Sequence, residues 1–318
     1  VSVPVSDVEG LVQLASDRNV DLVVVGPEIP LSLGVVDRMQ ESGIPSFGPT
    51  RAAATLESSK SFAHDIMNRC GVPCAASCAF TSIGPALDYA ATLNPPFVVK
   101  ADGLAAGKGA IIVQSQREAA DALLDMLERH VFGAAGDRVV IEEYLRGKEV
   151  SLLAFTDGEH VAPMVPSCDY KRALDGDGGL NTGGMGCYSP PGFFDSTLAQ
   201  KATDVAVRPV VRAMAEAGRP CKGVIYAGLM VDGADIHVLE FNARFGDPET
   251  QVILPRLESD LVDVLLSCVE GRLEPDSVRW RPGCSVGVVV ASGGYPGDYV
   301  KGRRISGLDM IDADVAVF

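Results

Sequence analysis

The first fifty residues alternate between short apolar runs and longer amphipathic stretches. Helices are expected over 7–19 and 31–43, and strands over 21–26 and 44–48. Strands that alternate with helices at this spacing predict a parallel sheet with helices on its faces. Because no methionine and no earlier glycine-rich strand and turn precede this unit, we expect the chain to begin inside an α/β domain.

The next hundred residues predict mixed helices and strands. Two helices are expected around a short strand within 58–93, and 97–113 has the pattern of a strand, a glycine-rich loop and a second strand. Apolar residues three and four apart predict a helix over 116–129. Further strands are expected at 138–144, 149–155 and 160–165.

Residues 167–190 form a polar, glycine-rich segment without periodicity, too long for a simple connector. Loops of this length inside compact domains are usually functional or mobile, so we expect an irregular functional loop. The expected elements after it are a long helix at 196–217, strands at 223–231 and 235–241, a helix at 258–270 and a strand at 284–292. That last strand predicts the start of a further unit, which is cut short at Phe318.

Composition narrows the class of protein. The 318 residues are 47% hydrophobic and 22% charged, as in ordinary globular proteins, and carry a formal charge of −15. Such acidity without a basic stripe argues against nucleic acid or an anionic membrane as a partner. No apolar run reaches the roughly 18 residues of a membrane span, and no signal-peptide pattern opens the chain.

The eight cysteines form no Cys-x-x-Cys pair. Cys70, Cys74 and Cys78 fall four apart, but Gly71 and Pro73 break any helix between them and no histidine follows closely. We therefore expect free thiols in a reducing compartment rather than a metal site. The four histidines share no motif and are expected to be structural.

The first candidate site is the glycine-rich loop of 100–109 with its two lysines. Glycines let backbone amides point at a polyanion, and Lys100 and Lys108 add positive charge. The spacing is one residue short of a P-loop, Gly109 replaces its hydroxyl residue, and a strand follows instead of a helix. We expect a flap over a nucleotide, with a structural glycine turn as the alternative.

Two further groups of polar residues follow along the chain. In 139–149, Glu142, Glu143 and Glu149 surround a turn, a pattern that carries little information alone. In 238–251, Glu240 and Asn242 lie two apart on a predicted strand, so they share a face. Their oxygens suit magnesium shared with substrate phosphates. If the strand continues, Arg244 joins that face and could neutralise a phosphoryl group in transfer.

These three groups, in this order, resemble the ATP-grasp superfamily. The resemblance implies an α/β and α+β protein, with the ATP-grasp fold preceded by a partial parallel domain. It implies ATP between two subdomains, with Lys60 and Lys100 toward the phosphates and metal ligands Glu240 and Asn242 holding Mg²⁺ or Mn²⁺. The remaining implied ATP contacts are Gly103, Gly107, Lys108 and Gly109 of the flap, Glu142, Glu143 and Leu145 near adenine, and Glu149 at the ribose.

Longer strings narrow the resemblance to the phosphoribosylamine–glycine ligase family. They are GPEIPL (26–31), SFGPT (46–50), LESSK (56–60), KADGLAAGKG (100–109), NTGGMG-x-YSP (181–190), EFN-x-RFGDPETQ (240–251) and GGYPGDY (293–299). Seven strings in family order are hard to explain by chance. They cover nearly the whole chain.

The resemblance implies a carbon–nitrogen ligase of purine synthesis. Glycine would become glycyl phosphate at the expense of ATP, and the amine of 5-phosphoribosylamine would then displace phosphate. Arg244, Lys100 and Asp247 would be catalytic, and a loop would exclude water. The implied substrate contacts are Gly183, Gly184, Met185, Gly186, Arg244 and Asp247 for glycine, and Glu28, Asp169, Lys171 and Arg172 for the ribosylamine.

The sequence departs from the family in three places. The family's opening Gly-rich turn with Arg-Glu-His is missing, and its C-terminal domain continues past Phe318. The family's usual Gln-Asp-His-Lys-Arg reads Cys-Asp-Tyr-Lys-Arg at 168–172. If the molecule lacked both ends, nucleotide binding should survive while full turnover would be in doubt.

The expected division has five parts: a partial α/β domain (1–55), a linker and start of the ATP-grasp fold (56–98), a small lid subdomain (99–160), a large subdomain (161–283) and the start of a C-terminal domain (284–318). We expect a cytoplasmic enzyme that acts on small molecules and is fused to, or accompanied by, other purine-pathway enzymes. The alternatives are an ATP-grasp enzyme that uses formate or bicarbonate, and a non-catalytic nucleotide-binding fragment.

Overall fold

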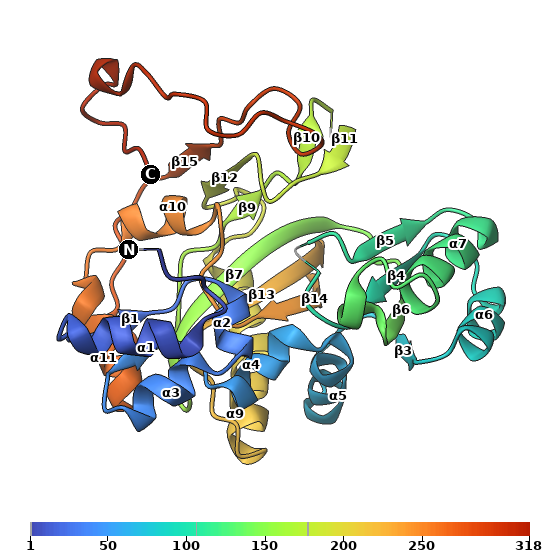
Figure 1. The fold of residues 1–318 in the computed structure, drawn as a ribbon, viewed down its shortest axis with the longest axis horizontal. Helices are drawn as coiled ribbons and strands as arrows, with labels where there is room; N and C mark the ends of the chain where they lie inside the picture. The colour runs from blue at the N-terminus through green and yellow to red at the C-terminus, as the bar shows by residue number, and fades with distance from the viewer. Residues whose placement is uncertain (1, 106, 177) are drawn as a thin grey trace.

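The computed structural model describes residues 2–105, 107–176 and 178–318. Ala106, in the predicted flap, and Asp177, in the predicted loop, are outside the described residues. A body built on one large sheet carries a lobe built on a smaller sheet, and the C-terminal segment lies over the body (Figure 1). Within the described part, no helix has the length and apolar character needed to cross a bilayer.

The N-terminal unit contains a parallel strand pair, as predicted. Its elements are α1 (Val8–Asp17), β1 (Val23–Val24), α2 (Glu28–Ser32), α3 (Val35–Glu41) and β2 (Ser46–Phe47). β1 and β2 pair in parallel. The single helix expected over 31–43 was wrong, because Gly34 adopts a left-handed conformation (φ +86°) and separates α2 from α3.

Two helices link this unit to the small lobe. α4 (Arg51–Ser58), which the sequence did not predict, is followed directly by α5 (Lys60–Cys70). Ser59 stands between them with extended backbone, and its side chain caps α5 by accepting a hydrogen bond from the Phe62 amide. This break places Lys60 at the first position of a helix.

The small lobe is a four-stranded antiparallel sheet covered by helices. Its strands run in the order β3 (Ser77–Phe80), β6 (Val139–Glu143), β4 (Phe97–Ala101), β5 (Ala110–Val113). Helices α6 (Ile83–Thr92) and α7 (Gln116–Leu127) pack on it around Phe97, Leu123 and Met126. The strand–loop–strand prediction for 97–113 is confirmed, since β4 and β5 form a hairpin.

The body holds the large sheet, whose two faces are both buried. Its order is β14 (Asp235–Asn242), β13 (Lys222–Asp232), β7 (Lys148–Asp157), β8 (Val161–Pro163), and all pairs are antiparallel. Along β13, Ile225 and Ala227 face one core cluster and Val224 and Tyr226 face another. This alternation explains the nearly continuous apolar run, because each face needs its own apolar residues.

Helices cover both faces of the large sheet. One face receives α5, α8 (Ser196–Ala202) and α9 (Arg208–Glu216), and the other receives α10 (Thr250–Ile253) and α11 (Leu261–Glu270). The long helix expected over 196–217 contains a π-helical turn, η2 (Thr203–Val207), between α8 and α9. The short 3-10 turns are η1 (Gly133–Gly136), η3 (Leu254–Arg256), η4 (Pro275–Ser277) and η5 (Leu308–Met310).

The segment 167–190 was expected to be irregular, and this was wrong. It contains β9 (Cys168–Asp169), β10 (Arg172–Leu174), β11 (Gly178–Asn181) and β12 (Gly186–Ser189). β12 lies between β9 and β15 (Ser285–Val288), a partner about a hundred residues away. Strands of two to four residues with distant partners leave no periodic signal, so the sequence could not reveal them.

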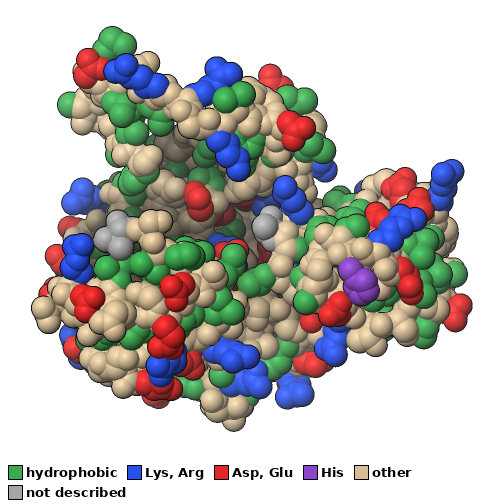
Figure 2. Space-filling model, viewed as in Figure 1, with side chains coloured by type: hydrophobic (Ala, Val, Ile, Leu, Met, Phe, Trp, Pro, Cys, Tyr) green, Lys and Arg blue, Asp and Glu red, His purple; other side chains and the backbone are tan. Residues whose placement is uncertain are grey.

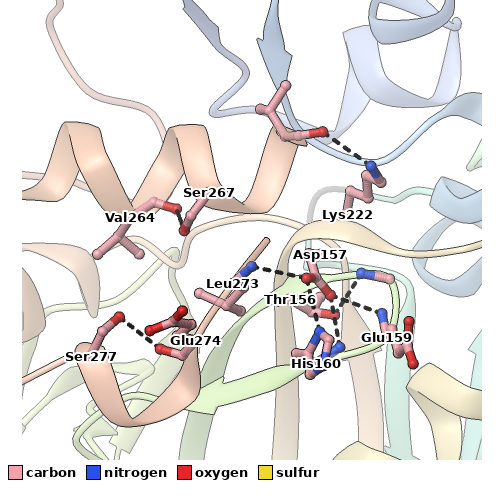
Figure 3. Close-up of polar contacts among 12 residues, drawn as sticks. Thr156, Asp157, Glu159, His160, Lys222, Val264, Ser267, Leu273, Glu274 and Ser277 are labelled. Carbon is pink, nitrogen blue, oxygen red and sulfur yellow. Dashed lines mark hydrogen bonds and ion pairs between the residues drawn. The ribbon is translucent and has the colours of Figure 1, made fainter. Parts of the chain in front are cut away.

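Asp157 ties the end of the large sheet to the segment that follows α11. Its buried carboxylate accepts hydrogen bonds from the amides of Glu159 (3.0 Å), His160 (2.7 Å) and Leu273 (3.1 Å), as Figure 3 shows. Burial raises the pKa of this carboxyl, but these hydrogen bonds outweigh it and the pKa lies below its ordinary value. A charged carboxylate therefore anchors the body away from the candidate site.

Strand pairing bears on the expected subdomain division. β3 lies in the part expected to hold the linker and the start of the ATP-grasp fold, and it pairs with β6. β7 lies in the expected lid but pairs with β13. We propose that the small subdomain comprises residues 77–143 and that β7 belongs to the large one. The other expected boundaries stay predictions.

Candidate functional site

Most of the predicted site residues come from parts of the chain that meet beside β14. These are the start of α5, the β4–β5 hairpin, the strands β6 and β7, the β9–β12 segment, and the end of β14 with the turn beyond it. Glu28 of α2 joins them through its ion pair with Arg244. In the space-filling view, acidic and basic side chains lie close together around the hollow of this face (Figure 2). The site is therefore highly charged, and some of its charges are paired, such as Lys100 with Glu142 and Lys171 with Glu149.

Lys60 is held against the glycine-rich loop. Its amide donates to the Asp102 carbonyl (3.1 Å), and its ammonium donates to the Gly103 carbonyl (3.3 Å). Asp102 in turn accepts a hydrogen bond from the Ser61 amide at 2.6 Å. Burial lowers the pKa of Lys60, with Glu240 opposing the shift. Within the described ranges the Lys60 ammonium has a carbonyl but no carboxylate as acceptor, and a cation that has lost water in this way is suited to receiving an anion.

Lys100 belongs to a buried ion-paired group. Its ammonium lies 2.7 Å from a Glu142 carboxylate oxygen and donates to the Leu239 carbonyl at 3.1 Å. The other carboxylate oxygen of Glu142 lies 2.8 Å from Nε2 of His64. Burial alone would raise the pKa of Glu142, but Lys100 and His64 lower it below its ordinary value. Glu142 thus contacts the predicted phosphate lysine, while Glu143 accepts a hydrogen bond from the Ala76 amide at 3.0 Å.

The flap faces a cleft of about 510 Å³. Gly107 and Lys108 form one wall, residues 181–183 a second, and residues 295–299 with Lys301 a third. The GGYPGDY string, which received no role from sequence, therefore forms part of the cleft. Its Tyr295 hydroxyl accepts a hydrogen bond from the Gly183 amide at 3.2 Å.

A smaller pocket of about 20 Å³ lies deeper, over the large sheet. Its lining residues are Glu149, Val150, Ser151, Asp169, Lys171, Tyr226, Gly228, Leu229, Leu239 and Glu240. It brings together residues that sequence assigned to different ligands, since Lys171 lies 2.6 Å from the carboxylate of Glu149. Burial raises the pKa of Asp169 to about 6, although Lys171 opposes this shift. Arg172 points elsewhere and donates to the Gly179 carbonyl in the β10–β11 hairpin.

Arg244 reaches the site in a different way from the one expected. β14 ends at Asn242, so Arg244 lies in the turn beyond it and not on the strand face. Its Nε lies 3.1 Å from Glu57 and 3.3 Å from Glu28, distances of ion pairs without good hydrogen-bond alignment. Glu57 also accepts a hydrogen bond from the Ala243 amide. Burial raises the pKa of Glu57 above its ordinary value, although the positive charge of Arg244 acts to lower it.

A buried polar group beside the inner pocket escaped sequence reasoning. The Tyr226 hydroxyl donates to Glu249 at 2.6 Å and lies 2.7 Å from the Ser151 hydroxyl. Glu249 belongs to the RFGDPETQ string, and membership of that string is the only sign of its importance in the sequence. Glu57 belongs to the LESSK string, and the sequence assigned it no role. Residues from distant strands meet here, so no local pattern marks them.

The loop of Gly183–Gly186 is fixed by its neighbours. Gly184 has φ +131°, and a Cβ there would lie 2.3 Å from Cδ of Pro248, so only glycine fits. The Met185 amide donates to the Tyr170 carbonyl at 2.7 Å. The loop thus contacts the RFGDPETQ segment, whose exposed Asp247 accepts a hydrogen bond from Gln251.

Oxygen donors for a metal ion are present but few. Glu240 and Asn242 lie opposite Gly228 and Tyr226, the first exposed and the second partly exposed. Over the described ranges, no three His, Cys, Asp or Glu side chains gather as a metal-binding group. One carboxylate and one amide oxygen fit a hard cation that takes its other ligands from phosphates and water.

Family models match most of the chain. The model described as "Phosphoribosylglycinamide synthetase, ATP-grasp (A) domain" matches residues 58–250, and the N-domain model of the same family matches 1–57. A phosphoribosylamine–glycine ligase from Vibrio parahaemolyticus is 49% identical over 315 residues, or 99% of this chain and 73% of the relative.

Solved structures agree with this relationship. A phosphoribosylamine–glycine ligase from Thermotoga maritima matches with a TM-score of 0.73 and 33% sequence identity. The match covers 79% of this chain and 63% of the Thermotoga chain. A biotin carboxylase from Campylobacter jejuni, solved as a β,γ-ATP complex, has a TM-score of 0.74 and 19% identity. This match covers 92% of the present chain and 64% of the biotin carboxylase chain, and it shows a likeness of fold alone.

Proposed function

The chain belongs to the phosphoribosylglycinamide synthetase family, and we propose that it joins glycine to phosphoribosylamine at the expense of ATP through glycyl phosphate. In the first step, a glycine carboxylate oxygen attacks the γ-phosphorus of ATP and ADP leaves. In the second, the ribosylamine nitrogen attacks the glycyl carbon, inorganic phosphate leaves and the nitrogen loses a proton. The product is glycinamide ribonucleotide of de novo purine synthesis.

One observation carries the proposal most directly. Lys60, Lys100 and Arg244, from three distant parts of the chain, meet around the end of β14 that bears Glu240. Phosphoryl transfer needs little covalent chemistry from a protein, and mainly positioning and neutralisation of charge. Two lysines and an arginine beside an exposed carboxylate are suited to that task.

We assign Glu240 and Asn242 to a Mg²⁺ or Mn²⁺ ion. The exposure of the Glu240 carboxylate and its nearness to Lys60 support this assignment, because ion and lysine would share the phosphates. The ion, when bound, would neutralise charge on the phosphoryl oxygens. Lys60 would hold the phosphate end of ATP, and Lys100 would contact it from the small lobe.

The substrate side is proposed from the inner pocket and the loop beside it. Asp169 supplies negative charge for the ammonium group of glycine, and Lys171 supplies positive charge for a carboxylate or phosphate. Glu149, which pairs with Lys171, remains our choice for the ribose of ATP. Arg244, fixed by Glu28 and Glu57, would face the phosphoryl group in transfer. The Gly183–Gly186 loop would exclude water from glycyl phosphate, and Asp247 would lie at its edge.

We also place the reaction in the cytoplasm, because all eight cysteines are free thiols, as a reducing compartment favours. Lys108, with Gly107 of the flap, would close over ATP from the side of the outer cleft. Glu143 and Leu145 remain our choice for the adenine end.

Transfer of heavy oxygen tests the intermediate. Glycine labelled with heavy oxygen in its carboxylate is incubated with the enzyme, ATP and phosphoribosylamine, and the phosphate is analysed by mass spectrometry. We expect one labelled oxygen in each phosphate released, because a carboxylate oxygen remains on phosphorus when the amine displaces it. Unlabelled phosphate from an active enzyme would rule out glycyl phosphate.

A further inference from the structure

His64 is buried next to the lysines of the site and has no role in the proposed chemistry so far. It lies one turn after Lys60 on α5 and is 5% exposed. Its Nε2 contacts the Glu142 carboxylate at 2.8 Å, and the opposite oxygen of that carboxylate contacts Lys100 at 2.7 Å. One buried carboxylate therefore joins two basic groups from separate elements, α5 and β4.

The position of Lys100 depends on this carboxylate. Lys100 is 7% exposed and Glu142 is 3% exposed, so water cannot replace either contact. Among the described residues, the Lys100 ammonium also donates to the Leu239 carbonyl, directly before Glu240. A change in the orientation of Glu142 would thus move the ammonium relative to the proposed metal ligand.

The charge of the group depends on His64. With a protonated imidazole, the three side chains carry one net positive charge, which attracts a polyphosphate. With a neutral imidazole, Glu142 would cancel Lys100 and the group would carry none. In a buried setting such a difference acts strongly on a nearby anion.

The surroundings favour the protonated form. Burial lowers the pKa of His64, whereas Cys74 and Glu142 raise it, and the resulting pKa is about 9. The groups facing the ring are Cys74 from the loop after α5 and Glu142 from β6, with Lys60 one turn earlier on the same helix. The Cys74 thiol is directed to Asn68 (3.8 Å), and Nδ1 has no hydrogen-bond partner among the described residues. In the described part of the chain, the direct hydrogen-bond contact of the ring is therefore the one between Nε2 and Glu142.

We propose that His64 is a positioning residue for ATP: its imidazolium holds Glu142 so that Lys100 stays directed at the phosphates with its charge uncancelled. This inference rests on the proposed function for the identity of the nucleotide. His64 would affect ATP affinity through Lys100 and would not contact the substrate directly.

Two substitutions in the full chain separate this role from simple packing. His64→Gln keeps a hydrogen-bond donor but removes the charge, and His64→Lys restores a cation that can reach Glu142. We expect His64→Gln to weaken ATP binding about tenfold, as expected for the loss of one buried charge interaction. His64→Lys should stay within about twofold of the parent. Calorimetric Kd values for ATP with Mg²⁺ measure both.

The pH dependence gives a second readout. ATP affinity of the parent protein should fall as pH rises through about 9, where His64 loses its proton, while that of His64→Lys should hold to higher pH. A matched control is His160→Gln, which also removes a histidine from a carboxylate, that of Asp157, away from the site. It should leave ATP affinity unchanged.

The outcomes are distinct. Equal weakening of ATP binding in the Gln and Lys variants, or unchanged binding in the Gln variant, would overturn the proposal. A melting temperature lowered equally in both variants without a difference in Kd would assign His64 a structural role only. Because Kd is measured without glycine, a protein that binds ATP but fails to ligate glycine would contradict the proposed function and leave this test intact.

Discussion

Glu240→Ala is expected to lower glycine-dependent turnover by about a thousandfold, the effect of losing a metal ligand that stabilises phosphoryl transfer. ATP affinity should fall far less, because Lys60 and Lys100, in the roles proposed for them, would still bind the phosphates. The large difference is expected because Glu240 is an exposed carboxylate of the site and lies near enough to both Lys60 and Lys171 to raise the pKa of each. Steady-state kcat and the Kd of ATP, measured together, separate these two effects.

A matched control lies on the same strand. Asp235 is an exposed carboxylate at the start of β14, paired with Asp232 at the far end from the site. Asp235→Ala should retain normal turnover. Near-normal turnover in Glu240→Ala would refute the metal assignment.

Arg244→Ala should lower kcat by about a hundredfold to a thousandfold, the usual loss when one charge-stabilising donor is removed. It should also lower the melting temperature, because Glu57 would remain buried without its cation. Arg244→Lys restores the charge but cannot reach Glu57 and Glu28 with the same planar group, so stability should recover more than kcat.

Comparison of the two substitutions locates the function of Arg244. Thermal unfolding and single-turnover rates are measured for both variants. If Arg244→Lys were as active as the parent, a fixed guanidinium would be unnecessary, and the proposed role in phosphoryl transfer would be wrong. If both variants kept full kcat but lost stability, Arg244 would serve only to pair with Glu57.

The outline of the fold followed from the sequence, because it rests on local patterns. The parallel N-terminal pair, the β4–β5 hairpin and the β13–β14 pair arise from apolar runs separated by glycine or polar turns. The short strands β9 and β12 could not be predicted. Their stability comes from pairing with each other and with β15, and such distant contacts leave no local pattern.

Site residues followed from sequence where a motif places them on one strand or loop. Glu240 and Lys100 are of this kind. The buried residues around the site are different, since His64, Glu57 and Glu249 form contacts with residues 78, 186 and 23 positions away. A buried acidic residue within a helix looks like any surface residue until the fold is known. The pairing of Glu149 with Lys171 was missed for the same reason.

The alternatives differ in the carboxylate that is activated. A formate- or bicarbonate-using relative would share the nucleotide side, including Lys60 and Lys100, and differ at the Gly183–Gly186 loop. Contact of that loop with Pro248 joins the two strings that favour glycine. A non-catalytic fragment would bind ATP without any carboxylate-dependent reaction.

The most direct test of glycine ligation is the release of ADP from ATP and Mg²⁺ with phosphoribosylamine present and one carboxylate added at a time. We predict release that depends on glycine and is accompanied by equal amounts of glycinamide ribonucleotide, with background rates for formate and bicarbonate. Release driven by formate or bicarbonate, or ATP binding without release in the presence of glycine, would contradict the account.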